Sequence, residues 1–193
     1  MKDAQKYYEV TKESRPHKLT QKFINMKIIP DKAIDLGCGA GRDTVYLIKN
    51  GWKVLAIDKE NSKEYIDLKL NEEERKNFKF QCQDFENIKL EKVKLIVANF
   101  SIPFCSKDKF KDLWNSITQN IIQNGYFVGN FFGLKDSWAY NKDKKIFLSK
   151  DEVLKLFESY FEIIDFQEIE KDGETALNGV KHWHIYNIIA RKK

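Results

Sequence analysis

The sequence predicts an α/β domain with a mostly parallel sheet, an antiparallel C-terminal strand and helices on both faces. Three observations lead to this fold class. Residues 33–58 alternate strand, glycine loop, helix and strand. The apolar run 93–98, an amphipathic helical stretch and the apolar run 126–133 repeat this alternation. The β-rich runs 162–170 and 183–190 follow without a helix between them, which predicts an antiparallel pair that completes seven strands.

Length and composition fit one globular domain. A chain of 193 residues, 42% hydrophobic and 33% charged, is long enough for one complete core and too short for two ordinary domains. We therefore expect a single domain over residues 1–193, with an N-terminal cap segment and helix at 1–30 and the core sheet at 31–193. The three cysteines are an odd number without a pairing pattern, so we expect them to be reduced and buried.

Charge and hydropathy limit the function classes. The net charge is +5, but the lysines are spread among nearly as many acids with no arginine-rich stripe, so nucleic acid is possible as a partner but not favoured. No window approaches the roughly 18 unbroken apolar residues of a membrane span, and the N-terminal stretch is too polar for a signal peptide. We expect a cytoplasmic protein without membrane contact.

The remaining elements follow from apolar spacing and from helix start and stop signals. The first half of the chain predicts a helix that starts at Pro16 with Leu19, Phe23 and Met26 on one side, a strand ending at Asp35 and Leu36, and a helix closed by Asn50 and Gly51. A strand at 52–57, a surface helix at 62–77 and a short strand at 79–82 follow. The second half predicts a core helix at 107–122, a polar loop at 134–148 and a helix that begins with the capping box of Ser149 and Glu152.

The glycine loop and the acid that follows it predict a nucleotide-type ligand. Gly37, Gly39 and Gly41 fall within five residues, which indicates a backbone that turns sharply or approaches a ligand closely. Asp58 ends the next strand, where an acid can accept both hydroxyls of a ribose. A dinucleotide site needs glycine at position 42. This chain has Arg42 there, so its pattern is G-x-G-x-G.

With Asp35 two residues before the first glycine, the segment DLGCGAGRD resembles motif I of class I S-adenosylmethionine (SAM) methyltransferases. The order of strands and helices resembles the Rossmann-like fold of these enzymes over almost the whole chain. This resemblance implies SAM as cofactor, S-adenosylhomocysteine (SAH) as product, and Asp35 and the three glycines among the cofactor-binding residues. It also implies in-line transfer of a methyl group, which relies mainly on alignment.

Residues at the ends of later strands receive roles from the same resemblance. Ligands bind outside the carboxyl ends of parallel strands, and Asp84 and Phe85 follow the strand at 79–82. They are expected to contact adenine, with Asp58 on the ribose; a plain turn acid is the alternative for Asp84. Asn99 and Phe100 follow the strand at 93–98 and are expected beside the transferable methyl group.

The segment before motif I often folds over the cofactor in SAM enzymes of this size. Tyr8, Arg15 or His17 could then close the pocket, because an aromatic face attracts a sulfonium cation. The alternative for this segment is a helix that only covers an edge of the sheet.

The methyl acceptor is expected to be a small molecule. DNA and RNA amino-methyltransferases typically carry Asn or Asp followed directly by Pro-Pro and an aromatic residue, whereas here the first proline comes four residues after Asn99. The short length, the GRD after the glycines, the N-terminal cap and the ending IIARKK resemble small tellurite-resistance-type and thiopurine-methyltransferase-like enzymes. An RNA or protein methyltransferase and a non-catalytic SAM-binding regulatory domain are the alternatives.

Histidines are the candidates for a catalytic base if the acceptor must lose a proton. His182 and His184 alternate across Trp183 and so face the same side of a strand, and His17 lies in the N-terminal segment. The stretch KHWH at 181–184 stands where the tellurite-type pattern has arginines. No third ligand lies at metal-binding spacing from the two strand histidines, so we expect no metal site.

Overall fold

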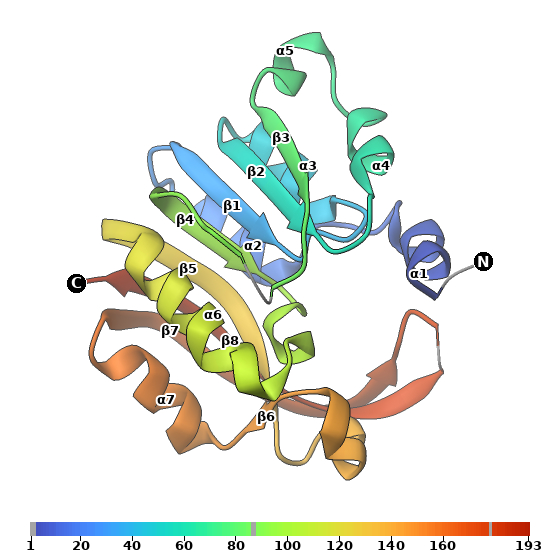
Figure 1. Ribbon diagram of the computed structural model, residues 1–193, viewed down its shortest axis with the longest axis vertical. Coiled ribbons are helices and arrows are strands. Elements are labelled where there is room, and N and C mark those ends of the chain that lie inside the picture. Colours follow the sequence, from blue (N-terminus) through green and yellow to red (C-terminus); the bar gives the residue numbers. More distant parts are fainter. Residues whose placement is uncertain (1–2, 86–87, 178) are drawn as a thin grey trace.

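One sheet with helices in front of it and behind it forms the body of the molecule (Figure 1). The structure is a computed structural model that describes residues 3–85, 88–177 and 179–193. The strands are β1 (Lys32–Leu36), β2 (Lys53–Asp58), β3 (Phe78–Cys82), β4 (Val93–Ala98), β5 (Ile121–Gly133), β6 (Phe147–Leu148), β7 (Phe161–Glu174) and β8 (Val180–Lys192). The helices are α1 (Asp3–Thr11), α2 (Lys18–Asn25), α3 (Arg42–Lys49), α4 (Lys63–Asp67), α5 (Glu72–Arg75), α6 (Lys107–Asn120) and α7 (Lys150–Glu158), and short 3-10 turns occupy Ile102–Phe104 and Ser137–Lys144.

The strand order is β3-β2-β1-β4-β5-β8-β7, with β6 paired to β5 off this path. The strands from β3 through β5 are parallel, so that Ile34 of β1 lies opposite Leu55 of β2 and Ile96 of β4. β8 runs antiparallel between β5 and β7. The predicted fold class is confirmed. The two-residue β6, an addition to the seven predicted strands, is too short to produce a periodic pattern in the sequence.

Helices cover both faces of the sheet (Figure 1). α6 and α7 pack on one face, where Trp114 and Phe157 meet Phe127 of β5 in an aromatic core. α2 and α3 pack on the other face, where Phe23 and Leu47 are fully buried in the second core. Each helix therefore buries the apolar stripe that its spacing predicts.

Three predicted helices have different bounds in the structure. The core helix predicted at 107–122 ends at Asn120, because the backbone is extended from Ile121, where β5 begins. The prediction of one helix over 62–77 is wrong: the segment forms α4 and α5, because Asn71 and Glu74 form a capping box that starts a new helix. The helix predicted from Pro16 begins at Lys18, because His17 is its N-cap.

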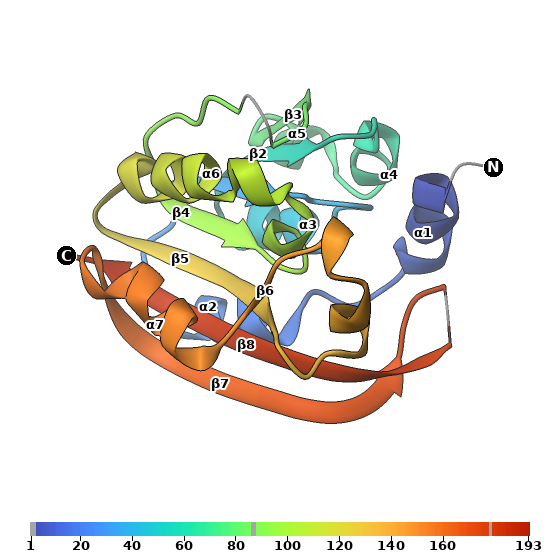
Figure 2. The ribbon, with the colours of Figure 1, turned by 60° about the horizontal axis from the view of Figure 1, so that its bottom comes forward.

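Two segments at the carboxyl ends of the parallel strands are more extensive than predicted. No helix is predicted from the sequence at α1. Among its described side chains Tyr8 is the buried hydrophobic one, so α1 lacks the wide apolar stripe by which a helix is recognised in a sequence. β7 and β8 form a long hairpin of 14 and 13 residues that curves toward α1 (Figure 2).

The three cysteines are free, as predicted, but they are not all buried. Cys38 and Cys105 are buried, whereas Cys82 is exposed because β3 is the edge strand of the sheet. Over the ranges that the structure describes, no helix is long and apolar enough to cross a membrane.

Candidate functional site

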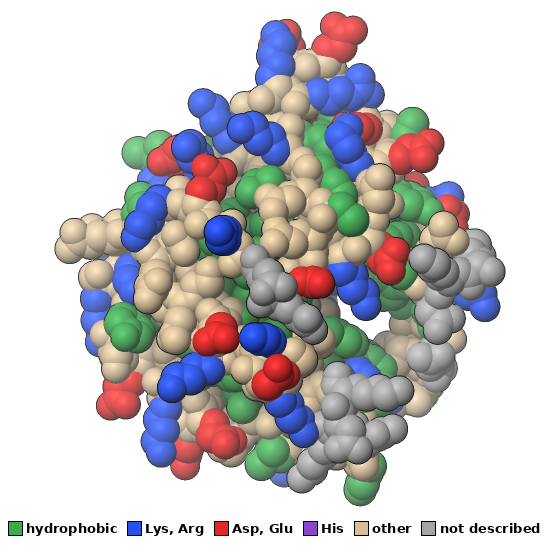
Figure 3. Space-filling view, viewed as in Figure 1, with side chains coloured by type: hydrophobic (Ala, Val, Ile, Leu, Met, Phe, Trp, Pro, Cys, Tyr) green, Lys and Arg blue, Asp and Glu red, His purple; other side chains and the backbone are tan. Residues whose placement is uncertain are grey.

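A cavity of about 1490 Å³ lies at the carboxyl ends of the parallel strands. Its walls come from the loops after β1, β2, β3 and β4, from α1 and from the β7–β8 hairpin. The space-filling view shows the molecule hollowed on this side (Figure 3). β1 and β4 are neighbours at the point where the strand order reverses, which is where open α/β sheets bind their ligands.

The glycine loop after β1 forms one wall, and its glycines serve different purposes. Gly37 and Gly39 line the cavity. Gly39 has φ +55°, and a Cβ atom there would touch the rings of Tyr7 and Tyr8 at 3.6 and 3.9 Å, so this side of the loop faces α1 where the two border the cavity. Gly41 does not line the cavity; it has φ +79°, and a Cβ atom there would lie 2.2 Å from Ile66. The third glycine therefore permits the packing of α3 against α4.

Asp58 ends β2 as a buried acid whose carboxylate faces the glycine loop. Oδ2 accepts a hydrogen bond from Gly39 N–H at 2.8 Å, and Oδ1 accepts one from the Tyr8 hydroxyl at 2.8 Å. Burial and then the charge of Asp58 raise the pKa of Tyr8, so its hydroxyl remains a donor. A carboxylate offers about four acceptor positions. Oδ1 also accepts the N–H of Glu60 at 3.3 Å, so Asp58 fixes the loop and α1 and keeps one acceptor position, on Oδ2, for a ligand.

Asp35, at the end of β1, is a buried acid beside the same loop. It is 3% exposed and accepts a hydrogen bond from the Thr44 hydroxyl. Burial, and then the neighbouring Asp43, raises the pKa of Asp35 to about 7 from its ordinary 3.8. Between these two pKa values the folded chain holds a proton that the unfolded chain has released, so this residue makes stability fall as the pH rises from about 4 to about 7.

We expect Asp35→Asn to raise the melting temperature more at pH 8 than at pH 4.5. The amide cannot ionise, so the variant avoids the penalty that the carboxylate acquires as pH rises, while its oxygen can still accept from Thr44. Thermal unfolding of both proteins at the two pH values checks this. An equal difference at both pH values would contradict the raised pKa.

Buried polar atoms without a partner gather at one end of the cavity. We call Asn99, Ser101, Asn130 and Asn187 the polar floor. Within the described residues, one side-chain atom of each, namely Asn99 Oδ1, Ser101 Oγ, Asn130 Nδ2 and Asn187 Oδ1, has no hydrogen-bond partner. Three of the four residues line the cavity. An unpaired buried polar group costs about 1–3 kcal/mol, so the polar floor fits a site that a polar ligand completes.

The loop after β4 is held in a strained conformation at the polar floor. Phe100 has φ +54°, which costs a residue with a side chain about 1–2 kcal/mol. Its N–H donates to Asn130 Oδ1 at 2.8 Å. Asn99 Nδ2 donates to Thr20 at 2.8 Å and to Asp43 at 3.0 Å. These bonds fix the loop in one position beside the cavity, and such maintained strain is typical of functional sites.

Five aromatic rings form a continuous wall of the cavity. This aromatic wall consists of Phe100, Phe104, Phe132, Trp138 and Trp183. Neighbouring ring centroids lie 5.5 to 6.3 Å apart. The pairs are tilted or edge-to-face, which is the geometry that aromatic pairs prefer. The cavity therefore has an apolar half that suits a flat, apolar group.

Lys181 fixes two tryptophans of the aromatic wall. Its buried ammonium lies 3.8 Å from the ring centroid of Trp138 and 3.9 Å from that of Trp183, and it forms an ion pair with buried Asp136. Asp136 also accepts the backbone N–H of Trp138 at 3.0 Å and of His184 at 3.2 Å. Burial lowers the pKa of Lys181, and Asp136 opposes this effect. The pair thus fastens the segment after β5 to β8.

Comparison with protein families identifies the group to which this chain belongs. Residues 2–168 match the family described as tellurite resistance protein TehB. The chain belongs to the TehB family. The predicted resemblance to class I methyltransferases of the tellurite-resistance type is thereby confirmed.

The fold of this TehB-family chain is also that of solved structures. TehB from Haemophilus influenzae has a TM-score of 0.74 at 21% identity, covering 92% of this chain and 62% of that one. The Burkholderia thailandensis 1,6-didemethyltoxoflavin-N1-methyltransferase has a TM-score of 0.70 at 18% identity, covering 91% and 76%. A carboxy-S-adenosyl-L-methionine synthase of Shewanella halifaxensis is 29% identical over 122 residues, 58% of this chain and 47% of the relative. The chain thus spans about half of that curated relative.

Most of the residues that are predicted to bind the cofactor in this TehB-family chain line the large cavity. They are Tyr8, Asp35, Gly37, Gly39, Asp58, Asp84, Phe85, Asn99 and Phe100. Gly41 and Arg15 do not line it, and Arg15 is exposed. Arg42 of the glycine loop lines the cavity instead. The roles of the individual residues stay predictions.

His17 lines the cavity as a neutral side chain. Burial lowers its pKa to about 4, so the ring is uncharged at pH 7. Its Nδ1 accepts a hydrogen bond from Leu19 N–H at 3.3 Å, which leaves the proton of the neutral ring on Nε2. In this setting His17 has no free basic nitrogen.

His182 and His184 lie on β8 outside the cavity lining. Buried His184 accepts the N–H of Lys135 at Nδ1 (3.1 Å), and its Nε2 lies 3.0 Å from Glu168. His182 lies 2.8 Å from Asp172 on β7. The ring of His184 therefore links β8 to β7 and to the segment after β5, and the ring of His182 links β8 to β7. In the part of the chain that the structure describes, no group of three His, Cys, Asp or Glu side chains could hold a metal ion.

On β8, three contributors to the cavity have no counterpart among the predicted site residues. Trp183, Ile185 and Asn187 alternate along β8 and all line the cavity. Their period-two spacing is visible in the sequence and places them on one face of a strand. The face that borders the cavity depends on the pairing of β8 with β5, which only the structure shows.

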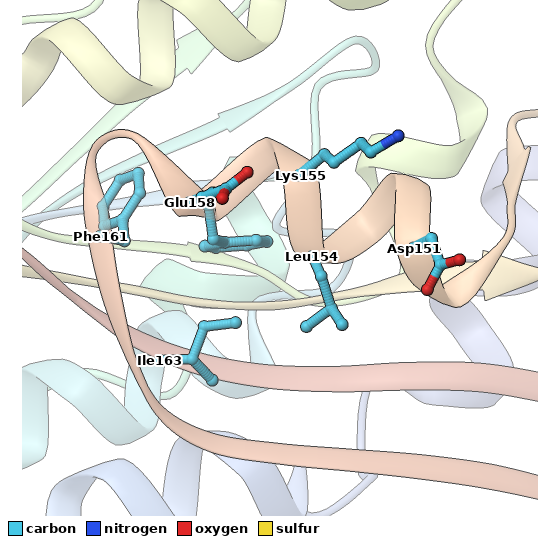
Figure 4. Close-up of a pocket in the computed structure, with 7 residues that line it drawn as sticks. Asp151, Leu154, Lys155, Glu158, Phe161 and Ile163 are labelled. Atoms are coloured by element: carbon cyan, nitrogen blue, oxygen red, sulfur yellow. The ribbon is translucent and has the colours of Figure 1, made fainter.

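A second, smaller hollow of about 440 Å³ lies between α7 and β7 (Figure 4). Leu154 of α7 and Ile163 of β7 point toward one another, while Lys155 points away. The hollow shares no lining residue with the large cavity, and none of its side chains has an unpartnered buried polar atom. Nothing in it indicates a ligand.

Proposed function

We propose that this chain is a SAM-dependent methyltransferase that acts on a small molecule. The observation that carries the proposal is the pairing of Asp58 with Gly39, whose N–H donates to the carboxylate at 2.8 Å at the edge of the cavity. An acid in this position suits the two hydroxyls of a ribose. The SAH bound in the structure of the Burkholderia methyltransferase supports the same cofactor.

The residues of the cavity fit SAM better than a dinucleotide. Asp43 is a buried acid beside the glycine loop, and negative charge there opposes the pyrophosphate of NAD. SAM instead carries a sulfonium and an ammonium. The unpartnered Asn99 Oδ1 offers an acceptor for the ammonium, and Asp58 would bind the ribose.

Two further residues would hold the adenine. Asp84 and Phe85 both line the cavity after β3, and Phe85 approaches the glycine loop at Gly37. We assign the exocyclic amino group to Asp84 and the ring to Phe85.

In the proposed reaction the bound cofactor supplies a methyl group on a sulfonium, and the leaving thioether is neutral. The chain then has to align the acceptor and exclude water. Positioning of this kind can supply up to about 7–11 kcal/mol of the barrier. The fixed loop at Phe100 and the aromatic wall serve this purpose. Nδ1 of His17 and both ring nitrogens of His184 already have partners, which fits a reaction without a histidine base.

Calorimetric titration with SAM, SAH and NADH tests the proposal. We expect SAM and SAH to bind with micromolar affinity and NADH to show no binding. Transfer of a labelled methyl group to small molecules of a cell extract would then establish turnover. Binding of NADH without SAM or SAH would contradict the proposed function and the interpretation of Arg42.

A further inference from the structure

We propose that the methyl acceptor is a planar, uncharged aromatic heterocycle that lies on Phe132 and Ile185, stacks against the aromatic wall and donates an N–H to Asn187. The inference rests on the proposed function and names the substrate class of the same cavity. Three features carry it: the order of side chains on β8, the position of the polar floor and the charges around the aromatic wall.

The side chains of β8 change from aromatic to polar along the cavity. Trp183, Ile185 and Asn187 line it in turn, and alternate residues of an antiparallel strand are about 6.8 Å apart. In the neighbouring strand β5, Phe132 lies opposite Ile185 and Asn130 lies opposite Asn187. One or two fused rings placed on Phe132 and Ile185 would thus meet an indole at one end and amides at the other.

The polar end of this surface adjoins the cofactor loop. Asn130 Oδ1 accepts the N–H of Phe100, and Ser101 is the next residue of that loop. A Cβ atom at Gly37 would lie 2.3 Å from Ser101 Cβ, so the loop after β4 touches the glycine loop directly. An acceptor that presents its polar edge to Asn187 therefore presents it toward the cofactor, and its rings extend toward Trp183.

One acceptor of the polar floor, Asn187 Oδ1, has no donor within hydrogen-bond distance among the described residues. Asn187 is 7% exposed, and its Oδ1 has no hydrogen-bond partner. An amide oxygen accepts hydrogen bonds and cannot donate them. The group that satisfies it is an N–H or O–H of the ligand. A heterocycle that also carries an unprotonated ring nitrogen can take the methyl group at that nitrogen, with the neutral thioether leaving, while its N–H stays on Asn187.

The charges around the aromatic wall select against a cationic acceptor. Lys181 lies between Trp138 and Trp183, and Lys145 lies 4.7 Å from the ring centroid of Trp138 and 5.5 Å from that of Phe104. Asp136 neutralises Lys181, and among the described side chains no carboxylate forms an ion pair with Lys145. The rings already face cations of the chain itself, so an aliphatic ammonium would be repelled, whereas a neutral ring would stack.

The test uses the 15N-labelled full chain saturated with SAH and benzimidazole as the probe, which is neutral at pH 7.5. The indole N–H signals of the four tryptophans, assigned by single Trp→Phe variants, report the site of binding. We expect the signals of Trp138 and Trp183 to shift, and those of Trp52 and Trp114, which lie in the two cores, to stay. 1-Methylbenzimidazole lacks the N–H and should bind about tenfold more weakly. Cyclohexylamine, which is cationic at this pH, should leave all four signals in place.

Two variants and one control locate the contacts. Asn187→Leu should remove the preference for benzimidazole over its methylated analogue, and Trp183→Leu should weaken both by about tenfold. Tyr160→Leu removes an exposed ring outside the cavity and should change neither affinity. If each variant binds SAH with the affinity of the unaltered chain, the part of the cavity that would bind the cofactor is intact.

The outcomes separate this inference from the proposed function. If SAH binds but benzimidazole shifts neither Trp138 nor Trp183 at millimolar concentration, the acceptor class is wrong and the proposed function stands. Equal binding of the two benzimidazoles to the unaltered chain also overturns the contact with Asn187. If SAH does not bind, while benzimidazole still shifts the two signals in the chain alone, the proposed function fails and the aromatic subsite is supported.

Discussion

Asp58→Ala is expected to weaken SAH binding about 10- to 150-fold, which corresponds to about 1.5–3 kcal/mol for hydrogen bonds to a charged group. The buried carboxylate is the acceptor that the ribose would use. Its loss also removes the partner of Gly39 N–H and of the Tyr8 hydroxyl, so the glycine loop and α1 lose a common anchor. Calorimetric titration with SAH measures the effect.

Two further variants distinguish the loss of the hydrogen-bond acceptor oxygens of Asp58 from the loss of its negative charge. Asp58→Asn keeps one acceptor oxygen and should fall between the parent and Asp58→Ala. Asp108→Ala removes an exposed acid that also lines the cavity, and it should leave the affinity almost unchanged. Equal losses in Asp58→Ala and Asp108→Ala would indicate a general effect of charge and contradict the ribose assignment.

Gly39→Val is expected to reduce SAH binding below detection while the chain still folds. The branched side chain would extend beyond a Cβ that already contacts the rings of Tyr7 and Tyr8, at 3.6 and 3.9 Å, so it would fill the space between the glycine loop and α1 that borders the cavity. The left-handed φ of +55° adds a destabilisation of about 1–2 kcal/mol. Thermal unfolding and SAH titration of the same preparation measure the two effects separately.

Gly51→Val is the matched control for backbone strain. Gly51 has φ +87° and lies outside the cavity, with Pro30 3.3 Å from the position of a Cβ. This variant should lose comparable stability and bind SAH as the parent does. Normal SAH binding by Gly39→Val would show that the cofactor does not approach this face of the loop.

The convergence of the glycine loop, Asp58, Asp84 and Asn99 on one cavity could be predicted from the sequence because most of these parts are local. The glycine loop, α3 and Asp58 belong to one β-α-β unit, and the alternation of elements places the strand ends at one edge of the sheet. Asp84 and Asn99 follow the next parallel strands and line the same cavity. Their side chains converge because parallel strands end at a common edge.

Some positions within the predicted motifs have roles that spacing does not reveal. Gly41 has the same residue type and nearly the same φ as Gly37, yet it permits contact with Ile66 of α4. His184 stands two residues from His182 on the same strand, but the approach of Lys135 and Glu168 fills the hydrogen-bonding capacity of its ring. In both cases the deciding neighbour comes from another element.

The sequence by itself determined the α/β class, the mostly parallel sheet and the position of the glycine loop and its acid, because periodicity and loop chemistry act over short stretches of chain. Only the tertiary structure decided the other half of the cavity. The antiparallel register brings Asn187 opposite Asn130 and Ile185 opposite Phe132, and α1 folds over so that Tyr8 reaches Asp58, 50 residues away. Contacts at such separations depend on how the whole chain packs, and no local pattern encodes them.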